Sequence, residues 1–241
     1  MALTDNLVSY WKLDESSGNA ADSHGSNTLV NTGVTYVAAL LNNGADFEAG
    51  DTQDKLAIAD ASQSGLDFTT ALSFSLWFKL ESAPATQVAF INKHAGGGNE
   101  QYFLAYRTAS TPNFRLSVDK TGTGVVQDIL GVNVTFNNAQ WYHIVCTWDG
   151  ATKTAKFYID GSQSGTDQVG TLVDSLYDGA SEFRIGGLSA DWFDGVVDEV
   201  GAWSRVLTGA EVTSLYNSGA PLAYPFTGGG AATNNWLLMG V

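Results

Sequence analysis

Basic residues are scarce in this chain of 241 residues. Eleven lysines and arginines stand against 25 aspartates and glutamates, which gives a formal net charge of −14. Such a chain repels a phosphate backbone and an anionic membrane, so nucleic acid is excluded as a partner and strongly acidic polysaccharides are disfavoured. Neutral sugars, other proteins and hard cations such as calcium stay open as ligands.

Cysteine and long apolar runs are also missing. Cys146 has no second cysteine to pair with, and its apolar surroundings in WYHIVCTW predict a core side chain. No apolar run reaches the roughly eighteen residues of a membrane-spanning helix, and the N-terminus MALTDNLVSYW lacks the pattern of a signal peptide. With Met1, these features predict a protein made in a cytoplasm and released by lysis, on a virion surface or free outside the cell.

Only four prolines accompany 27 glycines and many aromatic residues, which is typical of strands joined by tight turns. Alternation of apolar and polar residues predicts strands near residues 7–13, 45–47, 55–58, 72–80, 87–93, 101–107, 114–119, 141–148, 154–159, 182–185 and 195–204. Asp160-Gly161 predicts a type I′ hairpin, and the spacing of Thr208 and Glu211 before Gly219 predicts one short helix. The predicted fold is all-β, an antiparallel sandwich of two sheets with a short C-terminal helix.

The predicted domain covers residues 1–224, and residues 225–241 form a C-terminal tail. After a Gly/Ala/Thr/Asn spacer the tail carries Trp236, Leu237, Leu238 and Met239. Four exposed apolar side chains are unfavourable, so we expect them to dock on a virion or another protein subunit. The alternative is that the tail folds back over its own sheet.

Five segments in one order resemble a known family: LVSYWKLDESSGNAADSHGSN, ALSFSLWFKLES, WYHIVCTWDGATKTAKFYIDGSQSG, FRIGG and GVVDEVGAWSRVLTGAEVTSLYNSG. This order is similar to the laminin-G-like jelly rolls of the concanavalin A-like lectin and glucanase superfamily. The resemblance covers about residues 5 to 219. It implies two curved sheets, carbohydrate or protein binding, and often a structural calcium ion, although the fold alone identifies no ligand.

The resemblance also implies a place for calcium. Asp22 and Asp198 correspond to the N-terminal loop and the last long strand, which jointly hold the ion in the family. Asn27 and the acidic loop of residues 48–54 would add oxygen ligands. The alternative is that Asp22 caps a turn and Asp198 pairs with a nearby base.

Two loops are the predicted ligand-binding rim, because sugar sites combine an aromatic platform with a few polar groups. One loop offers Lys93, His94, Asn99 and Gln101, and the other offers Asp191 and Trp192. The alternative for Trp192 is that it covers the end of the sandwich.

No catalytic residue is predicted. The two-carboxylate strand pattern of the glucanases is absent, and alternation predicts that Asp198 and Glu199 point to opposite faces. His143 and Cys146 are three residues apart, which also predicts opposite faces of one strand.

The functional hypothesis is therefore a non-catalytic binding or adhesion module displayed on a virion, as a phage capsid-decoration or tail-associated protein. It would recognise a neutral glycan, and homo-oligomerisation stays open. The alternative is a free-standing bacterial lectin-like protein, and after that a glycoside hydrolase.

Overall fold

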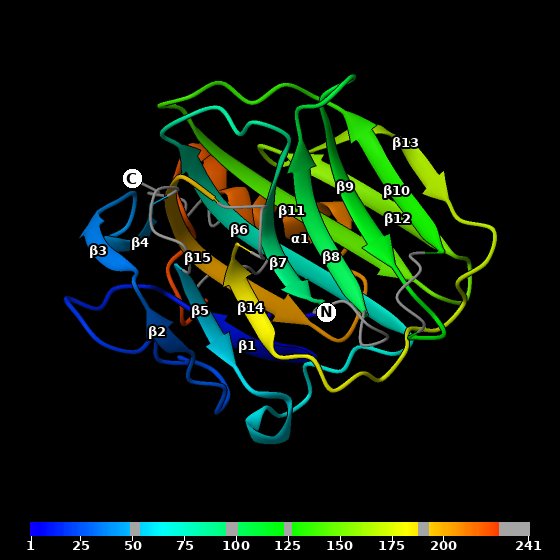
Figure 1. Cartoon of the computed structure of the whole chain (residues 1–241), viewed down its shortest axis with the longest axis horizontal. Coiled ribbons are helices and arrows are strands. Elements are labelled where there is room, and N and C mark those ends of the chain that lie inside the picture. Colours follow the sequence, from blue (N-terminus) through cyan, green and yellow to red (C-terminus); the bar gives the residue numbers. More distant parts are fainter. Residues whose placement is uncertain (49–53, 95–100, 123–126, 188–192, 227–241) are drawn as a thin grey trace, which may run out of the picture.

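A computed structural model describes residues 1–48, 54–94, 101–122, 127–187 and 193–226. In this part, two antiparallel sheets lie face to face, with the seven-stranded sheet in front in Figure 1 and one helix behind the other sheet. The predicted all-β sandwich with a short C-terminal helix is confirmed.

The rear sheet has eight strands. Its order is β13-β12-β11-β6-β15-β4-β3, and β1 pairs with β15 beside this path. Its strands are β1 (Leu7–Trp11), β3 (Thr35–Ala38), β4 (Asn43–Phe47), β6 (Ala71–Leu80), β11 (Trp141–Asp149), β12 (Thr154–Ile159), β13 (Ser162–Val169) and β15 (Gly195–Trp203).

The front sheet has seven strands in the order β10-β9-β8-β7-β14-β5-β2. They are β2 (Val30–Thr32), β5 (Lys55–Ile58), β7 (Gln87–Lys93), β8 (Tyr102–Arg107), β9 (Asn113–Val118), β10 (Asp128–Asn133) and β14 (Phe183–Gly186).

The main core lies between the sheets and is rich in aromatic rings. Phe78 packs against Phe90 with ring centroids 4.7 Å apart, which joins β6 of one sheet to β7 of the other. Cys146 is buried in the same core, as predicted. On β11, Tyr142, Ile144, Cys146 and Trp148 face this core while Val145 faces the opposite side, so the predicted alternation is confirmed.

A second apolar layer covers the outer face of the eight-stranded sheet. Helix α1 (Gly209–Tyr216) packs Val212 and Leu215 there, near Trp203 and Tyr10. The helix begins at the predicted capping box, in which the Thr208 side chain accepts from the Glu211 N–H. Among the described residues, no helix has the length and apolar character needed to cross a membrane.

The chain past α1 continues onto this layer. Phe226 contacts Tyr10 edge-on with ring centroids 5.1 Å apart, and Tyr224 stacks on Tyr10 at 5.0 Å. The described contacts therefore include Phe226, two residues past the predicted limit at residue 224, and the division into domain and tail stays a prediction. Residues 227–241, with Trp236, Leu237, Leu238 and Met239, lie outside the described residues, and their docking role stays a prediction.

Every strand expected from alternation is present, and the hairpin at Asp160-Gly161 joins β12 to β13 with positive φ at both residues. Four strands were not predicted, namely β2, β3, β10 and β13. In the described part they are the end strands of the two sheet orders. An end strand pairs on one side only and carries more polar exposed residues, so its apolar alternation is weak.

Candidate functional site

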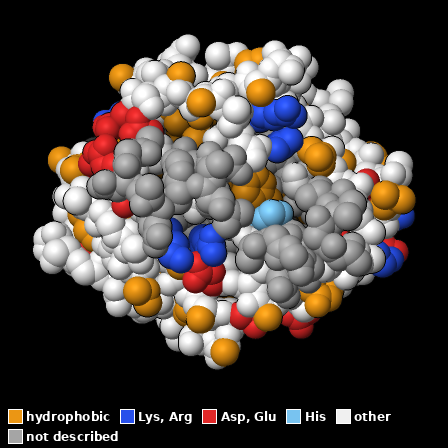
Figure 2. All heavy atoms as spheres, in the orientation of Figure 1, with side chains coloured by type: hydrophobic (Ala, Val, Ile, Leu, Met, Phe, Trp, Pro, Cys, Tyr) orange, Lys and Arg blue, Asp and Glu red, His pale blue; other side chains and the backbone are white. Residues whose placement is uncertain are grey.

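The outer face of the seven-stranded sheet is a surface built from rows of side chains across neighbouring strands. One row runs from Ala57 through Arg184, Asn92, Phe103 and Ser117 to Ile129, because these residues are register partners on β5, β14, β7, β8, β9 and β10. A second row contains Ala89, Ala105, Arg115 and Gly131, and a third contains Gln87, Arg107, Asn113 and Asn133. Figure 2 shows basic side chains on two sides of a histidine near the middle of this face.

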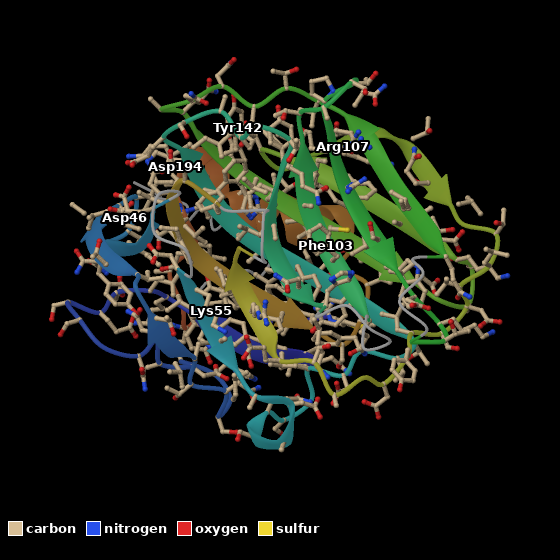
Figure 3. The ribbon with its side chains drawn as sticks, viewed as in Figure 1. Asp46, Lys55, Phe103, Arg107, Tyr142 and Asp194 are labelled. Carbon is tan, nitrogen blue, oxygen red and sulfur yellow. The ribbon has the colours of Figure 1, made fainter. Side chains whose placement is uncertain are left out.

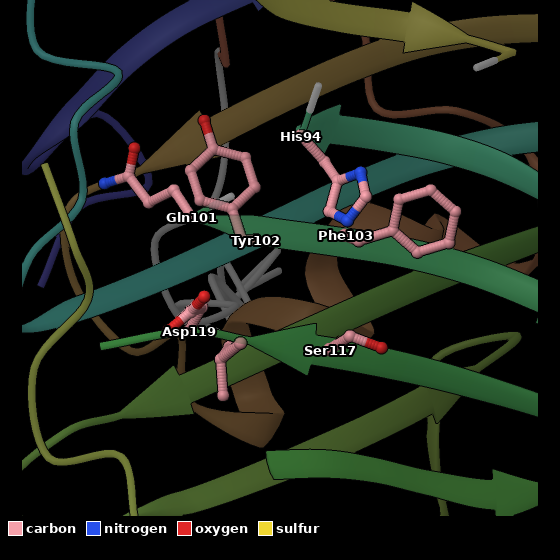
Figure 4. A pocket seen from close by; sticks show the side chains of 7 residues that line it. His94, Gln101, Tyr102, Phe103, Ser117 and Asp119 are labelled. Atoms are coloured by element: carbon pink, nitrogen blue, oxygen red, sulfur yellow. The ribbon is translucent and has the colours of Figure 1, made fainter. Parts of the chain in front are cut away.

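A shallow depression lies at one end of this face. Its lining includes His94, Gln101, Phe103, Ser117 and Asp119, which come from the ends of β7, β8 and β9 (Figure 4). The His94 ring lies 5.5 Å from the Phe103 ring, measured between centroids. Phe103 also contacts Ala89 and Ala105, and these three residues form a small buried apolar cluster beside the polar lining.

Two buried oxygen acceptors in this depression have no described partner. The Gln101 side chain donates to the Phe68 carbonyl, but its Oε1 atom accepts no hydrogen bond from the described residues. Asp119 Oδ1 accepts from the Thr121 N–H at 2.8 Å, whereas Oδ2 has no donor among the described residues. Because Gln101 is 0% and Asp119 1% exposed, both atoms are costly to leave unpaired. Two acceptors in the lining of the depression therefore lack a donor among the described residues, and both are buried beneath its surface.

The structure brings His94 and Gln101 together, as predicted, but it places Lys93 elsewhere. Lys93 is fully buried and contacts Asp60 at 2.5 Å, Asp67 and the Gly179 carbonyl. It is the register partner of Tyr102, whose ring is in the main core. The prediction that Lys93 belongs to the binding rim is wrong, because strand alternation turns it inward. The other predicted rim residues, Asn99, Asp191 and Trp192, lie outside the described residues.

The predicted calcium ligands Asp22 and Asn27 lie close together, but their oxygens already accept hydrogen bonds. Asp22 accepts from four backbone N–H groups, those of Tyr10, His24, Gly25 and Asn27. Burial alone would raise the pKa of Asp22, but these N–H groups outweigh it and lower that pKa. This pattern fits the alternative that Asp22 caps a turn.

Asn27 is a structural bridge beneath the same turn. Its side-chain oxygen accepts from the Ser64 N–H at 2.7 Å, and its amide donates to Ser9 Oγ and the Ser64 carbonyl. Its own carbonyl accepts from the Trp11 indole at 2.7 Å. The oxygens of Asn27 therefore already tie the N-terminal loop to the core.

Asp198 lies in a different acidic group, with Glu199 and Asp14. Asp198 pairs in register with Trp77, which stacks on Tyr216 of α1, so it points to the outer face of the eight-stranded sheet. Glu199 interacts with Tyr10 on that same face. The prediction that Asp198 and Glu199 point to opposite faces is wrong, because the register shifts between Asp198 and Gly201 and Glu199 has φ 52°. A bulge of this kind breaks side-chain alternation.

Carboxylate oxygens are ligands that calcium takes, but Asp14, Asp198 and Glu199 do not bring one oxygen each to within 4.8 Å of one another. Asp14 Oδ1 and Asp198 Oδ1 are buried without a hydrogen bond from the described residues, whereas the Glu199 carboxylate interacts with the Tyr10 side chain. Burial, and then the charges of Glu199 and Asp14, raise the pKa of Asp198 to about 8. Burial and Asp14 raise the pKa of Glu199 to about 7. Buried carboxylates that gain no cation are held neutral, and a hard cation would favour their charged form.

A second acidic group was not predicted as a unit. Carboxylate oxygens of Asp46, Glu48 and Glu81 lie within 4.8 Å of one another. Burial and the charges of Glu81 and Glu48 raise the pKa of Asp46 to about 6. Glu48 begins the acidic loop that was expected to supply a calcium ligand. The sequence alone could not predict this group, because Glu81 is more than thirty residues from Asp46 and Glu48. The pairing of β15 with both β4 and β6 brings the three residues together.

His143 and Cys146 lie on opposite faces of β11, as predicted. The thiol is in the main core, whereas His143 contacts Ser75 at 2.9 Å under the ring of Tyr216. Burial lowers the pKa of His143 to about 3, so the imidazole is neutral. The Ser75 and His143 pair was not predicted, and the helix covers it.

Two stacked antiparallel sheets, in which neighbouring strands are often far apart in the sequence, define a jelly-roll sandwich. The family model of the concanavalin A-like lectin/glucanases superfamily matches residues 50–213, more than half of the chain. The chain therefore belongs to that superfamily, as its sequence segments predicted. No curated protein matches the sequence significantly.

Similar solved structures share the fold at low sequence identity. Domain 4 of AbnA, a GH43 extracellular arabinanase from Geobacillus stearothermophilus, in complex with arabinotriose, is 18% identical with a TM-score of 0.64, over 88% of this chain and 98% of that one. The binding domain of Paraclostridial Mosquitocidal Protein 1 is 16% identical with a TM-score of 0.69, and the match covers 90% of this chain and 53% of that chain. The binding domain of Botulinum Neurotoxin DC in complex with SialylT is 12% identical with a TM-score of 0.66, and the match covers 90% of this chain and 52% of that chain.

Proposed function

We propose that this chain is a glycan-binding module whose site is the depression at the end of β7, β8 and β9. The observation that carries the proposal is the pair of buried acceptors, Asp119 Oδ2 and Gln101 Oε1, without a donor among the described residues. Sugar hydroxyls are donors that would satisfy both atoms. The Phe103 ring, which is 6% exposed, borders the depression beside His94, and sugar sites commonly combine an aromatic ring with polar groups.

The comparisons support this class of ligand. One similar domain is seen with arabinotriose and another with SialylT, although their identity to this chain is low. Binding by a non-catalytic module is the proposal, with glycoside hydrolysis as the alternative. Incubation with an oligosaccharide that binds, followed by analysis for shortened products, separates the two.

A glycan array tests the proposal, with Asp119→Asn as the diagnostic variant. Asparagine keeps an oxygen for the Thr121 N–H but loses the charge and one acceptor, so we expect at least a tenfold loss of affinity. Asp167→Asn is the matched control, because Asp167 is an exposed aspartate on β13 of the other sheet. Failure of the parent protein to bind any glycan, in calcium and in chelator, would overturn the proposal, as would equal binding by Asp119→Asn.

We also propose that Asp198 and Asp14, with Glu199 beside them, hold a structural calcium ion. The buried, unpaired Oδ1 atoms of Asp198 and Asp14 support this proposal. The ion would supply positive charge that fastens the N-terminal segment to β15. It would not take part in contacts with the glycan.

Display on a virion surface, as a capsid-decoration or tail-associated protein, stays a prediction from the sequence. A free-standing bacterial lectin-like protein is the alternative. Mass spectrometry of purified particles separates them, because a displayed module must be present in the particle and a free lectin must not.

A further inference from the structure

Three of the four arginines lie on the outer face of the seven-stranded sheet. Arg107 is on β8, Arg115 on β9 and Arg184 on β14, while Arg205 is elsewhere. Phe103 and Ala105 mark the outer face of this sheet, since their side chains are not in the main core. Arg115 pairs in register with Ala105, and Arg107 lies two residues after Ala105 on the same strand, so both point to that face. Arg184 also points outward, because it pairs with Asn92, which pairs with Phe103. A chain with net charge −14 thus concentrates its guanidinium groups on the face that carries the depression.

The two ends of this basic surface differ. At one end Glu182 forms ion pairs with both Lys55 and Arg184, so most of that charge is balanced within the protein. The pKa of Glu182 shows this balance: burial alone would raise it, but Lys55 and Arg184 lower it. At the other end, Arg107 has no ion pair with a carboxylate among the described residues and is half-buried. Within the described part of this surface, the charge of Arg107 is therefore not balanced by a carboxylate.

The surroundings of Arg107 are suited to an anion. Arg115 lies diagonally opposite on the neighbouring strand, at roughly 7–8 Å between backbones. Its guanidinium donates to the side-chain oxygen of Gln87, which pairs in register with Arg107. The contact with Gln87 directs Arg115 across β8 toward the row of Arg107, where Asn113 adds an amide. Guanidinium groups match the two oxygens of a carboxylate or the oxygens of a sulfate.

The same strand connects this end to the depression. Phe103 and Arg107 lie four residues apart on β8, which is about 13 Å along a strand (Figure 3). Ala89 and Ala105 lie between them on the same face, and both are buried. One sugar ring cannot fill the depression and reach Arg107, whereas an oligosaccharide can.

We propose that the ligand is an acidic oligosaccharide, whose hydroxyls bind in the depression and whose carboxylate or sulfate group binds Arg107 and Arg115. This inference rests on the proposed glycan-binding function. It replaces the neutral glycan expected from the overall charge, because charge averaged over the chain does not describe one face.

Binding measurements on matched oligosaccharides test the inference. The set contains one neutral backbone, the same backbone ending in a carboxylated sugar, its methyl ester, and the sulfated form. We expect at least tenfold tighter binding of a charged form than of the neutral backbone and the ester. The carboxylated and sulfated arms identify the anion. The preference should decrease as salt rises.

Arg107→Gln should remove the preference for the charged form and leave binding of the neutral backbone unchanged. Arg107→Lys should restore part of the preference, because lysine keeps the charge without the planar fork. Lys156→Gln is the matched control, since it removes a cation from β12 on the other sheet. Equal affinity for neutral and charged forms, or an unchanged preference in Arg107→Gln, would overturn the inference while leaving glycan binding in place. Absence of binding to every member would overturn the function itself.

Discussion

Asp198 and Glu199 are adjacent on β15, yet both side chains lie on the same face of the eight-stranded sheet. The bulge at this point, with the left-handed backbone of Glu199, turns the second carboxylate toward Tyr10 and Asp14. Burial and mutual repulsion then raise the pKa of Asp198 to about 8, and burial with Asp14 raises that of Glu199 to about 7. We therefore expect the free energy of unfolding to depend on pH and on added cations.

In metal-free protein, the free energy of unfolding should fall as pH rises from about 4 to about 8. In the unfolded chain Asp198 has the ordinary pKa of 3.8 and Glu199 that of 4.5. In the folded protein the pKa of Asp198 is about 8 and that of Glu199 about 7, so both groups keep their protons to higher pH. Folding therefore takes up protons in this window, at no more than about 1.4 kcal/mol per pH unit for each group. Urea unfolding across pH measures the slope, and Asp198→Asn should flatten it. A slope that Asp198→Asn leaves unchanged would contradict this assignment.

Chelation should lower the melting temperature of the parent protein, and added calcium should restore it. A cation that binds only the folded state stabilises it by mass action. Asp198→Asn should abolish the response to chelator. Asp22→Asn should lower the melting temperature but keep the response, because Asp22 accepts backbone N–H groups instead. Identical melting with and without chelator would exclude the site, and loss of the response in Asp22→Asn alone would return the ligand role to Asp22.

Lys93→Met should destabilise the fold by about 2–4 kcal/mol, because it removes the cation that holds Asp60 and Asp67 together. The cost is moderated because both carboxylates are partly exposed and can bind water. Lys156→Met, which removes an exposed cation paired with Asp167, should leave the free energy of unfolding unchanged. Urea unfolding measures the free energy of unfolding of both variants. Equal losses would show that burial of Lys93 does not increase its contribution to stability.

Deletion of residues 228–241 should leave the melting temperature nearly unchanged and abolish attachment to particles or assembly. The retained residues Tyr224 and Phe226 already pack on Tyr10, so the second apolar layer stays closed. Differential scanning calorimetry and particle-binding assays measure the two effects. A strongly destabilised monomer would instead show that the tail belongs to the domain's own core.

Local patterns in the sequence were sufficient for much of the fold. Asp160-Gly161 favours positive φ by itself, and Thr208 with Glu211 forms its capping box within one helical turn. Strands in the interior of each sheet have strong alternation, because one face must be apolar. The strand of residues 162–169 reads SQSGTDQV and has no such pattern. Its pairing with β12 alone makes it a strand.

The candidate site was only partly predictable. The neighbourhood of His94 and Gln101 followed from one loop, but Asp119 and Arg107 join it through the pairing of β7, β8 and β9. Lys93 was placed on the rim because it adjoins the loop of His94 and Gln101, whereas two distant aspartates, Asp60 and Asp67, pair with it inside the sandwich.

The sequence by itself determined the all-β class, the turn at Asp160-Gly161, the helix cap and the opposite facing of His143 and Cys146, because each depends on backbone geometry within a few residues. Only the tertiary structure decided that Asp198 and Glu199 share a face and that three arginines gather on one sheet of an acidic chain. The first depends on a bulge that forms where β15 meets its neighbours, and the second on the register of strands such as β7 and β14, in which Asn92 pairs with Arg184. Net charge and alternation are properties of the chain alone, whereas proximity is set by hydrogen bonding between strands across the whole sheet.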